Sequence, residues 1–291
     1  MQMIYDDEAT EGILLVDAKN AFNSLNREAA LHNVQYLCPA LATSLFNCYQ
    51  RPSRLFVSGE GELQSEEGTT QGDPLSMPFY TLATLPLVHL LQKEHPVVRQ
   101  VWMADDSAGA GKLRALRLWW DTLCNVGKLY GYNTNGAKTF LLVHHDLVEV
   151  ASELFNGTGV QVTTSGVRYL GNAIGDADVL EASLQEKGKE WKLELETLAI
   201  FARTEPHAAF TALAHGLLGK FSYVLRTIRS TERDVSVLDE FLEKCFPPAL
   251  TGRTGFTTDE LTLLRLPARL GGIAGFLSYV SNGGSGVTED D

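Results

Sequence analysis

The strongest constraint on the fold is a short apolar run, Gly12 to Val16, that ends abruptly at Asp17. Its side chains are branched aliphatics after the glycine, which is typical of a strand buried on both faces of a sheet. A carboxylate directly after such a strand is costly unless it is hydrated, paired or bound to a cation. The run therefore predicts a buried strand whose end carries an acidic group.

The remainder of the first 178 residues alternates between strand-like and helix-like patterns. Strands are predicted within residues 54–64, 97–111, 139–143 and 160–175, the last as a glycine-rich hairpin. Helices are predicted at 26–45, 76–91 and 113–129, with Asn26 as an N-cap and Pro39 interrupting the first stretch. This alternation predicts an α+β domain in which helices pack on an antiparallel sheet.

The pattern changes at about Asp178, where strand signals vanish and helical periodicity continues to Cys245. A loop is expected at residues 266–273. The Gly/Ser-rich, acidic tail over residues 281–291 is expected to be disordered. The chain is thus predicted to contain a sheet domain over residues 13–178 and a helical domain over residues 179–280.

Composition and the start of the chain favour an intracellular protein. No run reaches the roughly 18 consecutive apolar residues of a membrane helix, and residues 1–8 lack the basic and apolar segments of a signal peptide. The four cysteines are scattered without metal-ligand spacing, so we expect buried or partly buried free thiols. A cytoplasmic or nuclear protein without a membrane partner is therefore predicted.

Two predicted strand ends carry acidic side chains, Asp17 in one and Asp105 with Asp106 in the other. Neighbouring antiparallel strands would bring these carboxylates side by side. Clustered hard oxygen donors suit Mg²⁺, which binds one or two carboxylates together with substrate phosphates. Two such ions can activate an attacking hydroxyl and stabilise a leaving pyrophosphate. The three aspartates are therefore candidate ligands for two Mg²⁺ ions, with Mn²⁺ as a possible substitute.

Five segments, in this order, resemble the motifs of reverse transcriptases. They are the first catalytic motif (Asp17 to Phe22), the Q-G-x-P-x-S segment (Gln71 to Ser76), the x-x-D-D turn (Met103 to Asp106), the glycine-to-lysine motif (Gly131 to Lys138) and the primer-grip hairpin (Tyr169-Leu170-Gly171). The nearest resemblance is to the retrotransposon type, without long terminal repeats. It implies a right-hand polymerase palm over residues 13–178, a helical thumb after it, and copying of RNA into DNA.

The resemblance also implies a role for each matched residue. Asp17 and Asp105 would be the main catalytic metal ligands, supported by Asp106. Residues that would bind the incoming nucleotide are Ala18, Phe22, Gln71, Gly72 and Lys138, and those that would steer the primer end are Tyr169, Leu170 and Gly171. The implied partners are an RNA template, a DNA primer and deoxynucleoside triphosphates.

Plainer alternatives remain open for several of these residues. Phe22 would otherwise be a core aromatic, and Lys138 an exposed lysine without a ligand. Gln71 and Gly72 would serve only the geometry of a loop before a helix. Tyr169-Leu170-Gly171 would be a tight hairpin with a glycine at its bend.

Three features oppose an active polymerase. Met103 stands where the family usually has an aromatic residue, and only residues 1–12, a remnant of the basic fingers region, precede the first run. The net charge of −12 opposes tight binding of nucleic acid, which basic faces usually drive. An inactive retroelement remnant with at most weak RNA binding is the alternative hypothesis. An RNA polymerase that copies RNA is a third, which Phe22 opposes.

Replacing Phe22 by Val is predicted to raise the incorporation of ribonucleotides relative to deoxynucleotides. The smaller side chain would no longer exclude the 2′-hydroxyl of the incoming sugar. Single-nucleotide primer extension with each sugar type measures this ratio. Unchanged sugar selectivity in an active Phe22→Val enzyme would remove Phe22 from this role.

Overall fold

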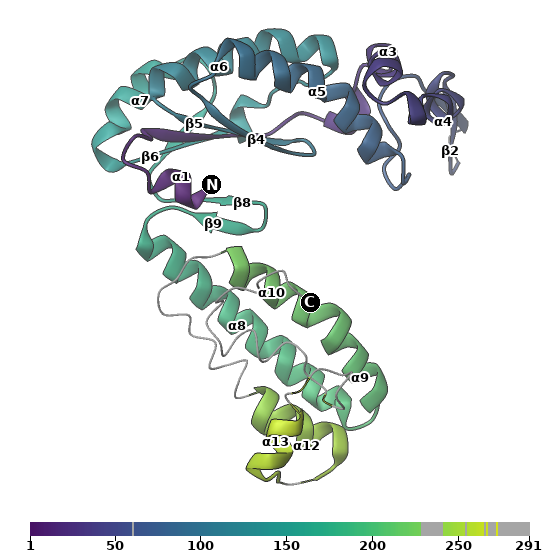
Figure 1. Ribbon diagram of the computed structural model, residues 1–291, viewed down its shortest axis with the longest axis vertical. Helices are drawn as coiled ribbons and strands as arrows, with labels where there is room; N and C mark the ends of the chain where they lie inside the picture. The colour runs from purple at the N-terminus through teal and green to yellow at the C-terminus, as the bar shows by residue number, and fades with distance from the viewer. Residues whose placement is uncertain (60, 228–240, 254, 265, 267–271, 273–291) are drawn as a thin grey trace. The chain divides into compact units, whose positions relative to one another are not determined.

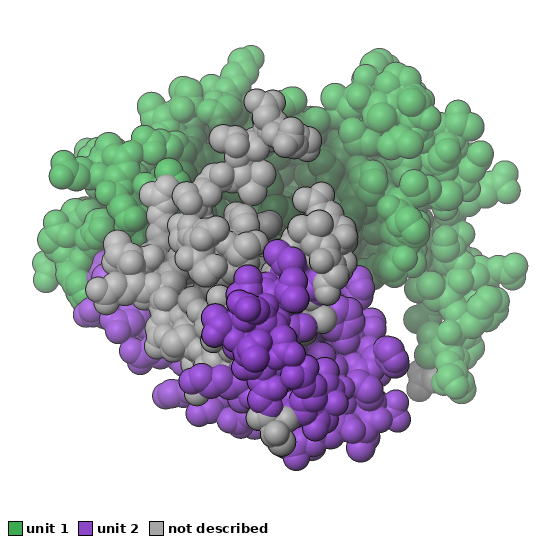
Figure 2. Space-filling model, turned by 60° about the horizontal axis from the view of Figure 1, so that its bottom comes forward, with its two compact units in different colours: residues 1–169 green, residues 170–291 purple. Residues whose placement is uncertain are grey.

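The computed structural model of the chain describes residues 1–59, 61–227, 241–253, 255–264, 266 and 272. The predicted tail at 281–291 and most of the predicted loop at 266–273 lie outside the described residues. Two compact units are formed, Met1–Tyr169 and Leu170–Asp291 (Figures 1 and 2). Each is described by itself below.

The first unit is built on a five-stranded sheet with the order β4-β5-β1-β6-β7. Its strands are β1 (Gly12–Val16), β4 (Arg99–Met103), β5 (Asp106–Gly111), β6 (Phe140–Val143) and β7 (Gln161–Thr163). All five residues of β1 are buried, as its apolar run predicts. Both neighbours, β5 and β6, pair with β1 in antiparallel orientation.

The prediction of one hairpin over residues 160–175 is wrong in its first part. Residues Gln161–Thr163 form β7, which pairs in parallel with β6, so the sheet is mixed rather than purely antiparallel. A parallel pair needs a crossover connection, and the segment that joins the end of β6 to the start of β7 contains helix α7 (Val148–Leu154). The hairpin itself is limited to β8 (Val167–Tyr169) and β9 (Asn172–Ile174).

Helices α5, α6 and α7 lie over one face of the sheet (Figure 1). The helices of this unit are α1 (Gln2–Tyr5), α2 (Ala21–Ser24), α3 (Arg27–Leu37), α4 (Pro39–Tyr49), α5 (Ser76–Glu94), α6 (Leu113–Val126) and α7, with 3₁₀ turns η1 (Gly127–Tyr130), η2 (Gly136–Lys138) and η3 (His145–Leu147). Alternate strand residues Leu14 and Val16 share a core with Trp119 and Trp120 of α6. The spacing of two in β1 therefore presents one row of side chains to the helices.

The predicted helical stretch at residues 26–45 is two helices. Asn26 is confirmed as an N-cap, since its side chain accepts a hydrogen bond from the Ala29 N–H at 2.9 Å. Pro39 begins α4, where its missing N–H has no helical partner to lose. The predicted hairpin that follows consists of β2 (Ser53–Val57) and β3 (Gly61–Ser65).

A buried arginine joins the end of this hairpin to α3. Arg27 is 5% exposed, and its guanidinium donates to the carbonyl oxygens of Ser65, Glu67 and Gly68. Burial lowers the pKa of Arg27, an effect that the Glu67 carboxylate opposes. Three backbone acceptors would lose their partner without this side chain, so Arg27 fixes the chain just before Gln71.

The described residues of the second unit are mainly helical from Ala177 onward, as predicted. The helices described there are α8 (Ala177–Ala202), α9 (Pro206–Ala212), the π-helix η4 (Leu213–Leu217), α10 (Leu218–Thr227), the π-helix η5 (Phe241–Cys245), α12 (Phe246–Thr251) and α13 (Thr258–Leu264). They enclose a separate core that includes Trp191, Leu195, Phe221 and Phe246. The α+β class is thus confirmed, while the domain limits at 12/13 and 178/179 stay predictions.

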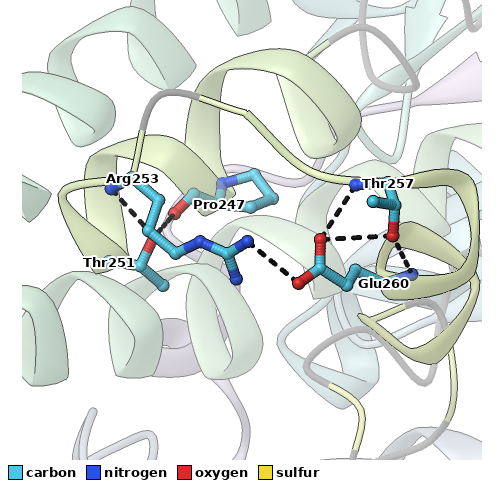
Figure 3. Close-up of polar contacts among 5 residues, drawn as sticks. All are labelled: Pro247, Thr251, Arg253, Thr257 and Glu260. Carbon is cyan, nitrogen blue, oxygen red and sulfur yellow. Dashed lines mark hydrogen bonds and ion pairs between the residues drawn. The ribbon is translucent and has the colours of Figure 1, made fainter.

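Helix α13 begins with a capping box, drawn in Figure 3. The Glu260 carboxylate accepts from the Thr257 N–H at 2.9 Å, and the Glu260 N–H donates to Thr257 Oγ1 at 3.3 Å. Arg253 adds an ion pair to Glu260 at 2.9 Å. The hydrogen bond from the Thr257 N–H, followed by the one from Arg253, holds the pKa of Glu260 below its ordinary value.

Within the described residues, no helix combines the length and apolar character needed to cross a membrane.

The sequence predicts that the cysteines are buried or partly buried free thiols. All four are free thiols, but Cys48 and Cys245 are exposed. For Cys48 the reason is that α4 buries only Leu45 and Tyr49.

Gly131 and Gly157 provide a matched test of how the chain packs after η1. Both have φ of 77°, a left-handed conformation that costs a non-glycine residue about 1–2 kcal/mol. A Cβ at Gly131 would lie 1.9 Å from the Ser24 carbonyl oxygen, whereas one at Gly157 would meet no atom within 4 Å. We expect Gly131→Ala to lower the free energy of unfolding by a further ~1–3 kcal/mol compared with Gly157→Ala. Urea unfolding measures both, and equal losses would contradict the close packing of Gly131 on Ser24.

Candidate active site

The register of the sheet brings the predicted acidic residues to one end of neighbouring strands. Val16 of β1 pairs with Ser107 of β5, so Asp17 and Asp106 are the next residues on their strands at that end. Met103 pairs with Asp106 across β4 and β5, which leaves Ala104 and Asp105 as a two-residue turn. As predicted, the strands that carry these aspartates are antiparallel neighbours.

The turn that carries Asp105 has an unusual backbone. Ala104 has φ of 55°, a left-handed value that side chains with a Cβ rarely adopt. Two-residue hairpin turns favour positive φ because their twist then matches that of the strands. The sheet geometry thus holds Ala104 in a conformation that an isolated chain would seldom populate.

Like charges act on one another within this group of aspartates. Burial raises the pKa of Asp106 above its ordinary value, and the charges of Asp105 and Asp17 raise it further. Burial and the charge of Asp106 also raise the pKa of Tyr169 to about 12. The local field therefore opposes ionisation, and an added positive charge would relieve it.

The residues after η1 contact both aspartate-bearing segments, which sequence analysis did not foresee. The Tyr132 hydroxyl donates to the Asp105 carbonyl oxygen at 2.9 Å. The Asn135 N–H donates to the Asp17 carbonyl oxygen at 2.8 Å, and Asn135 Nδ2 donates to Asp17 Oδ2 at 3.0 Å. Their only sequence signal is their place inside the glycine-to-lysine motif.

Ala18 and Phe22 lie directly after Asp17. Ala18 is buried and forms an isolated antiparallel bridge with Thr134. Phe22, in α2, is partly buried and stacks on Tyr80, with ring centroids 4.6 Å apart. Burial, followed by the influence of Tyr132 and Asp105, raises the pKa of the Tyr80 hydroxyl. Phe22 thus packs on a buried tyrosine whose pKa is influenced by the charge of Asp105.

Gln71 and Gly72 are exposed in the loop before α5. The preceding residues fix that loop to α2, because the Thr69 N–H donates to the Phe22 carbonyl oxygen at 2.7 Å. At Gly68, where φ is 76°, a Cβ would lie 2.4 Å from the same oxygen. Glycine at this position is therefore required by the close approach of the two segments.

The remaining predicted residues are placed as follows. Lys138 ends η2 and is exposed. Tyr169 ends β8, and Leu170 and Gly171 form the turn to β9 with φ of 47° and 84°, which is the pattern of a type I′ hairpin turn. The Tyr223 hydroxyl donates to the Leu170 carbonyl oxygen. The roles assigned to these residues stay predictions.

No preformed metal cage is present in the described part of the chain. Among those residues, no group of three or more His, Cys, Asp or Glu side chains is arranged to hold an ion. Asp17, Asp105 and Asp106 thus offer hard oxygen donors without a complete ligand set of their own.

Comparisons with solved structures give likenesses to telomerases. No protein-family model and no curated protein match the chain. Telomerase from Candida tropicalis with a TWJ fragment of telomeric RNA is 12% identical over 97% of this chain and 50% of its own, with a TM-score of 0.46. The Candida albicans telomerase complex with the same kind of fragment is 13% identical over 94% of this chain and 50% of its own, with a TM-score of 0.41. Apo Candida tropicalis telomerase lacking its C-terminal domain is 15% identical over 57% of this chain and 34% of its own, with a TM-score of 0.38.

The chain thus spans at most half the length of these solved chains. Likeness at such identities and TM-scores assigns neither a family nor an activity.

The raised pKa of Asp106 predicts how stability depends on pH when divalent cations are removed by a chelator. The folded chain binds a proton more tightly than the unfolded chain, so stability falls as pH rises from the ordinary Asp pKa of about 3.9 through the raised value. At neutral pH, Asp106→Asn should therefore unfold at a higher urea concentration than wild type. The gain in free energy of unfolding should be less than ~1 kcal/mol, because the group is partly exposed.

The difference should shrink as pH falls below that window. Asp146→Asn, at an exposed position in η3, is the control and should behave like wild type. An Asp106→Asn variant that is less stable than wild type at neutral pH would contradict repulsion among the aspartates.

Proposed function

We propose that the chain is a polymerase palm and thumb of the reverse transcriptase kind, which adds deoxynucleotides to a DNA primer on an RNA template. The observation that carries the proposal is the meeting of Asp17, Asp105 and Asp106 at one end of the sheet, from two segments far apart in sequence. The retrotransposon type without long terminal repeats is part of the proposal, on the basis of the motif order.

The donor chemistry at this end of the sheet suits divalent cations. The carboxylates of Asp105 and Asp17 repel that of Asp106, and a cation would relieve this repulsion. Mg²⁺ usually binds one or two carboxylates and completes its shell with water and substrate phosphates, so a cage of three protein ligands is not required. Two Mg²⁺ ions, or Mn²⁺, would supply activation of the primer hydroxyl and stabilisation of pyrophosphate.

The protein side chains would then position the reactants. Asp17 and Asp105 would hold the cations, with Asp106 assisting. Ala18 and Phe22 would lie at the incoming nucleotide, where the ring of Phe22 is supported by Tyr80. Nucleotide and primer contacts would be completed by Gln71, Gly72, Lys138, Tyr169, Leu170 and Gly171.

A catalytically inactive retroelement remnant with at most weak RNA binding is the second candidate. The net charge of −12 is the observation in its favour, because it opposes attraction of phosphates.

Primer extension by the purified chain tests the proposal. The reaction contains an RNA template, a labelled DNA primer, Mg²⁺ and deoxynucleotides. We expect wild type to extend the primer and Asp105→Asn to abolish extension, because loss of a carboxylate removes a cation ligand. Asp146→Asn removes the same charge at an exposed position and should keep activity.

Each other outcome selects an alternative. A well-folded wild-type chain that extends nothing would favour the inactive remnant. Extension with ribonucleotides in preference to deoxynucleotides would favour an RNA polymerase. Equal activity of wild type and Asp105→Asn would remove Asp105 from the site.

A further inference from the structure

The segment from Tyr132 to Asn135 touches both strand ends that carry aspartates. We propose that this segment positions the two against each other, with Asn135 orienting the Asp17 carboxylate and Tyr132 holding the turn of Asp105. The inference rests on the proposed function, in which these aspartates bind cations. Both residues act through the aspartates and are therefore positioning residues.

Asn135 makes two contacts to Asp17 that together fix its backbone and its side chain. The backbone N–H donates to the Asp17 carbonyl oxygen at 2.8 Å, and Nδ2 donates to Oδ2 at 3.0 Å. The bond to Oδ2 limits rotation of the Asp17 carboxylate and so sets the direction in which its oxygens face. A carboxamide carries no charge, so it orients the carboxylate without neutralising it. An arginine or a lysine in its place would neutralise the carboxylate.

Tyr132 holds the other strand end through its hydroxyl. This residue is 1% exposed, and its phenolic hydroxyl can donate one hydrogen bond. It donates to the Asp105 carbonyl oxygen at 2.9 Å and lies 2.9 Å from Ser107 Oγ. Since the single hydroxyl proton goes to Asp105, Ser107 must donate to the tyrosine oxygen.

The segment is itself held from several directions. The Lys19 N–H donates to the Asn133 carbonyl oxygen at 2.7 Å, and Ser24 Oγ donates to the Gly131 carbonyl oxygen at 2.8 Å. The Tyr132 ring packs edge-on against Trp102, with centroids 5.3 Å apart. A segment fixed in this way can transmit its own geometry to both aspartates.

The first test compares Asn135→Ala with Asn133→Ala in the full chain. Asn133 lies on the same segment, but its side chain donates to the Gly131 carbonyl oxygen rather than to an aspartate. Electron paramagnetic resonance of free Mn²⁺ measures cation affinity. We expect Asn135→Ala to weaken Mn²⁺ binding by about tenfold or more and Asn133→Ala to leave it unchanged. If the alanine variant does not fold, Asn135→Ser removes the same contact.

The second test needs no cation. Hydrogen–deuterium exchange is followed in the peptides that contain Asp17 and the Ala104–Ser107 turn. Tyr132→Phe should speed exchange in the turn, because the Asp105 carbonyl loses its donor. Ser107→Ala keeps that bond and should have a smaller effect, while Asn135→Ala should act on the peptide of Asp17.

The two tests separate the inference from the proposed function. Wild-type chain that binds no Mn²⁺ would overturn the cation site, and exchange would still decide whether the segment positions the aspartates. Mn²⁺ binding that Asn135→Ala leaves intact would overturn the orienting role of Asn135. Exchange that Tyr132→Phe leaves unchanged would overturn the role of Tyr132.

Discussion

The antiparallel pairing of β1 with β5 is the interaction on which the rest of the first unit depends. A slip of one residue would turn every side chain of β1 to the opposite face and move Asp17 away from Asp106. Small residues of β5 help to define the register, since a Cβ at Gly109 would lie 3.2 Å from Val98 and 3.4 Å from Trp119. Close packing of α6 on β5 therefore helps to fix the register of β5 against β1, and this register places Asp106 beside Asp17.

The acidic end is held by neutral hydrogen-bond donors. The Asn135 carboxamide and the Tyr132 hydroxyl contact Asp17 and the Asp105 backbone without cancelling negative charge. The pKa of Asp106 is consequently raised in the folded chain, first by burial and then by the charges of Asp105 and Asp17. A site arranged in this way gives up some stability and keeps its carboxylates available for a positively charged ligand.

Local patterns made much of this fold predictable, and distant partners account for what they missed. The run before Asp17, the Asn26 cap and the helix after the Gln71 loop depend on neighbouring residues, so the sequence alone indicates them. The partner of Asn135 lies 118 residues away, and the parallel pairing of β7 depends on a crossover. Arg27 gave one usable signal, because a charged residue there shares the buried helical face of Ala30 and Leu31.

The central position of β1 also dictates when the first unit can assemble during synthesis. The ribosome makes this strand before both of its partners, which are complete only at Gly111 and Val143. Until then, five buried-type residues present unpaired backbone on both edges, which favours association with other chains. Pairing over such sequence distances is slow compared with helix formation. Until β6 has left the ribosome, the nascent chain therefore exposes an edge of β1 that can pair with other chains.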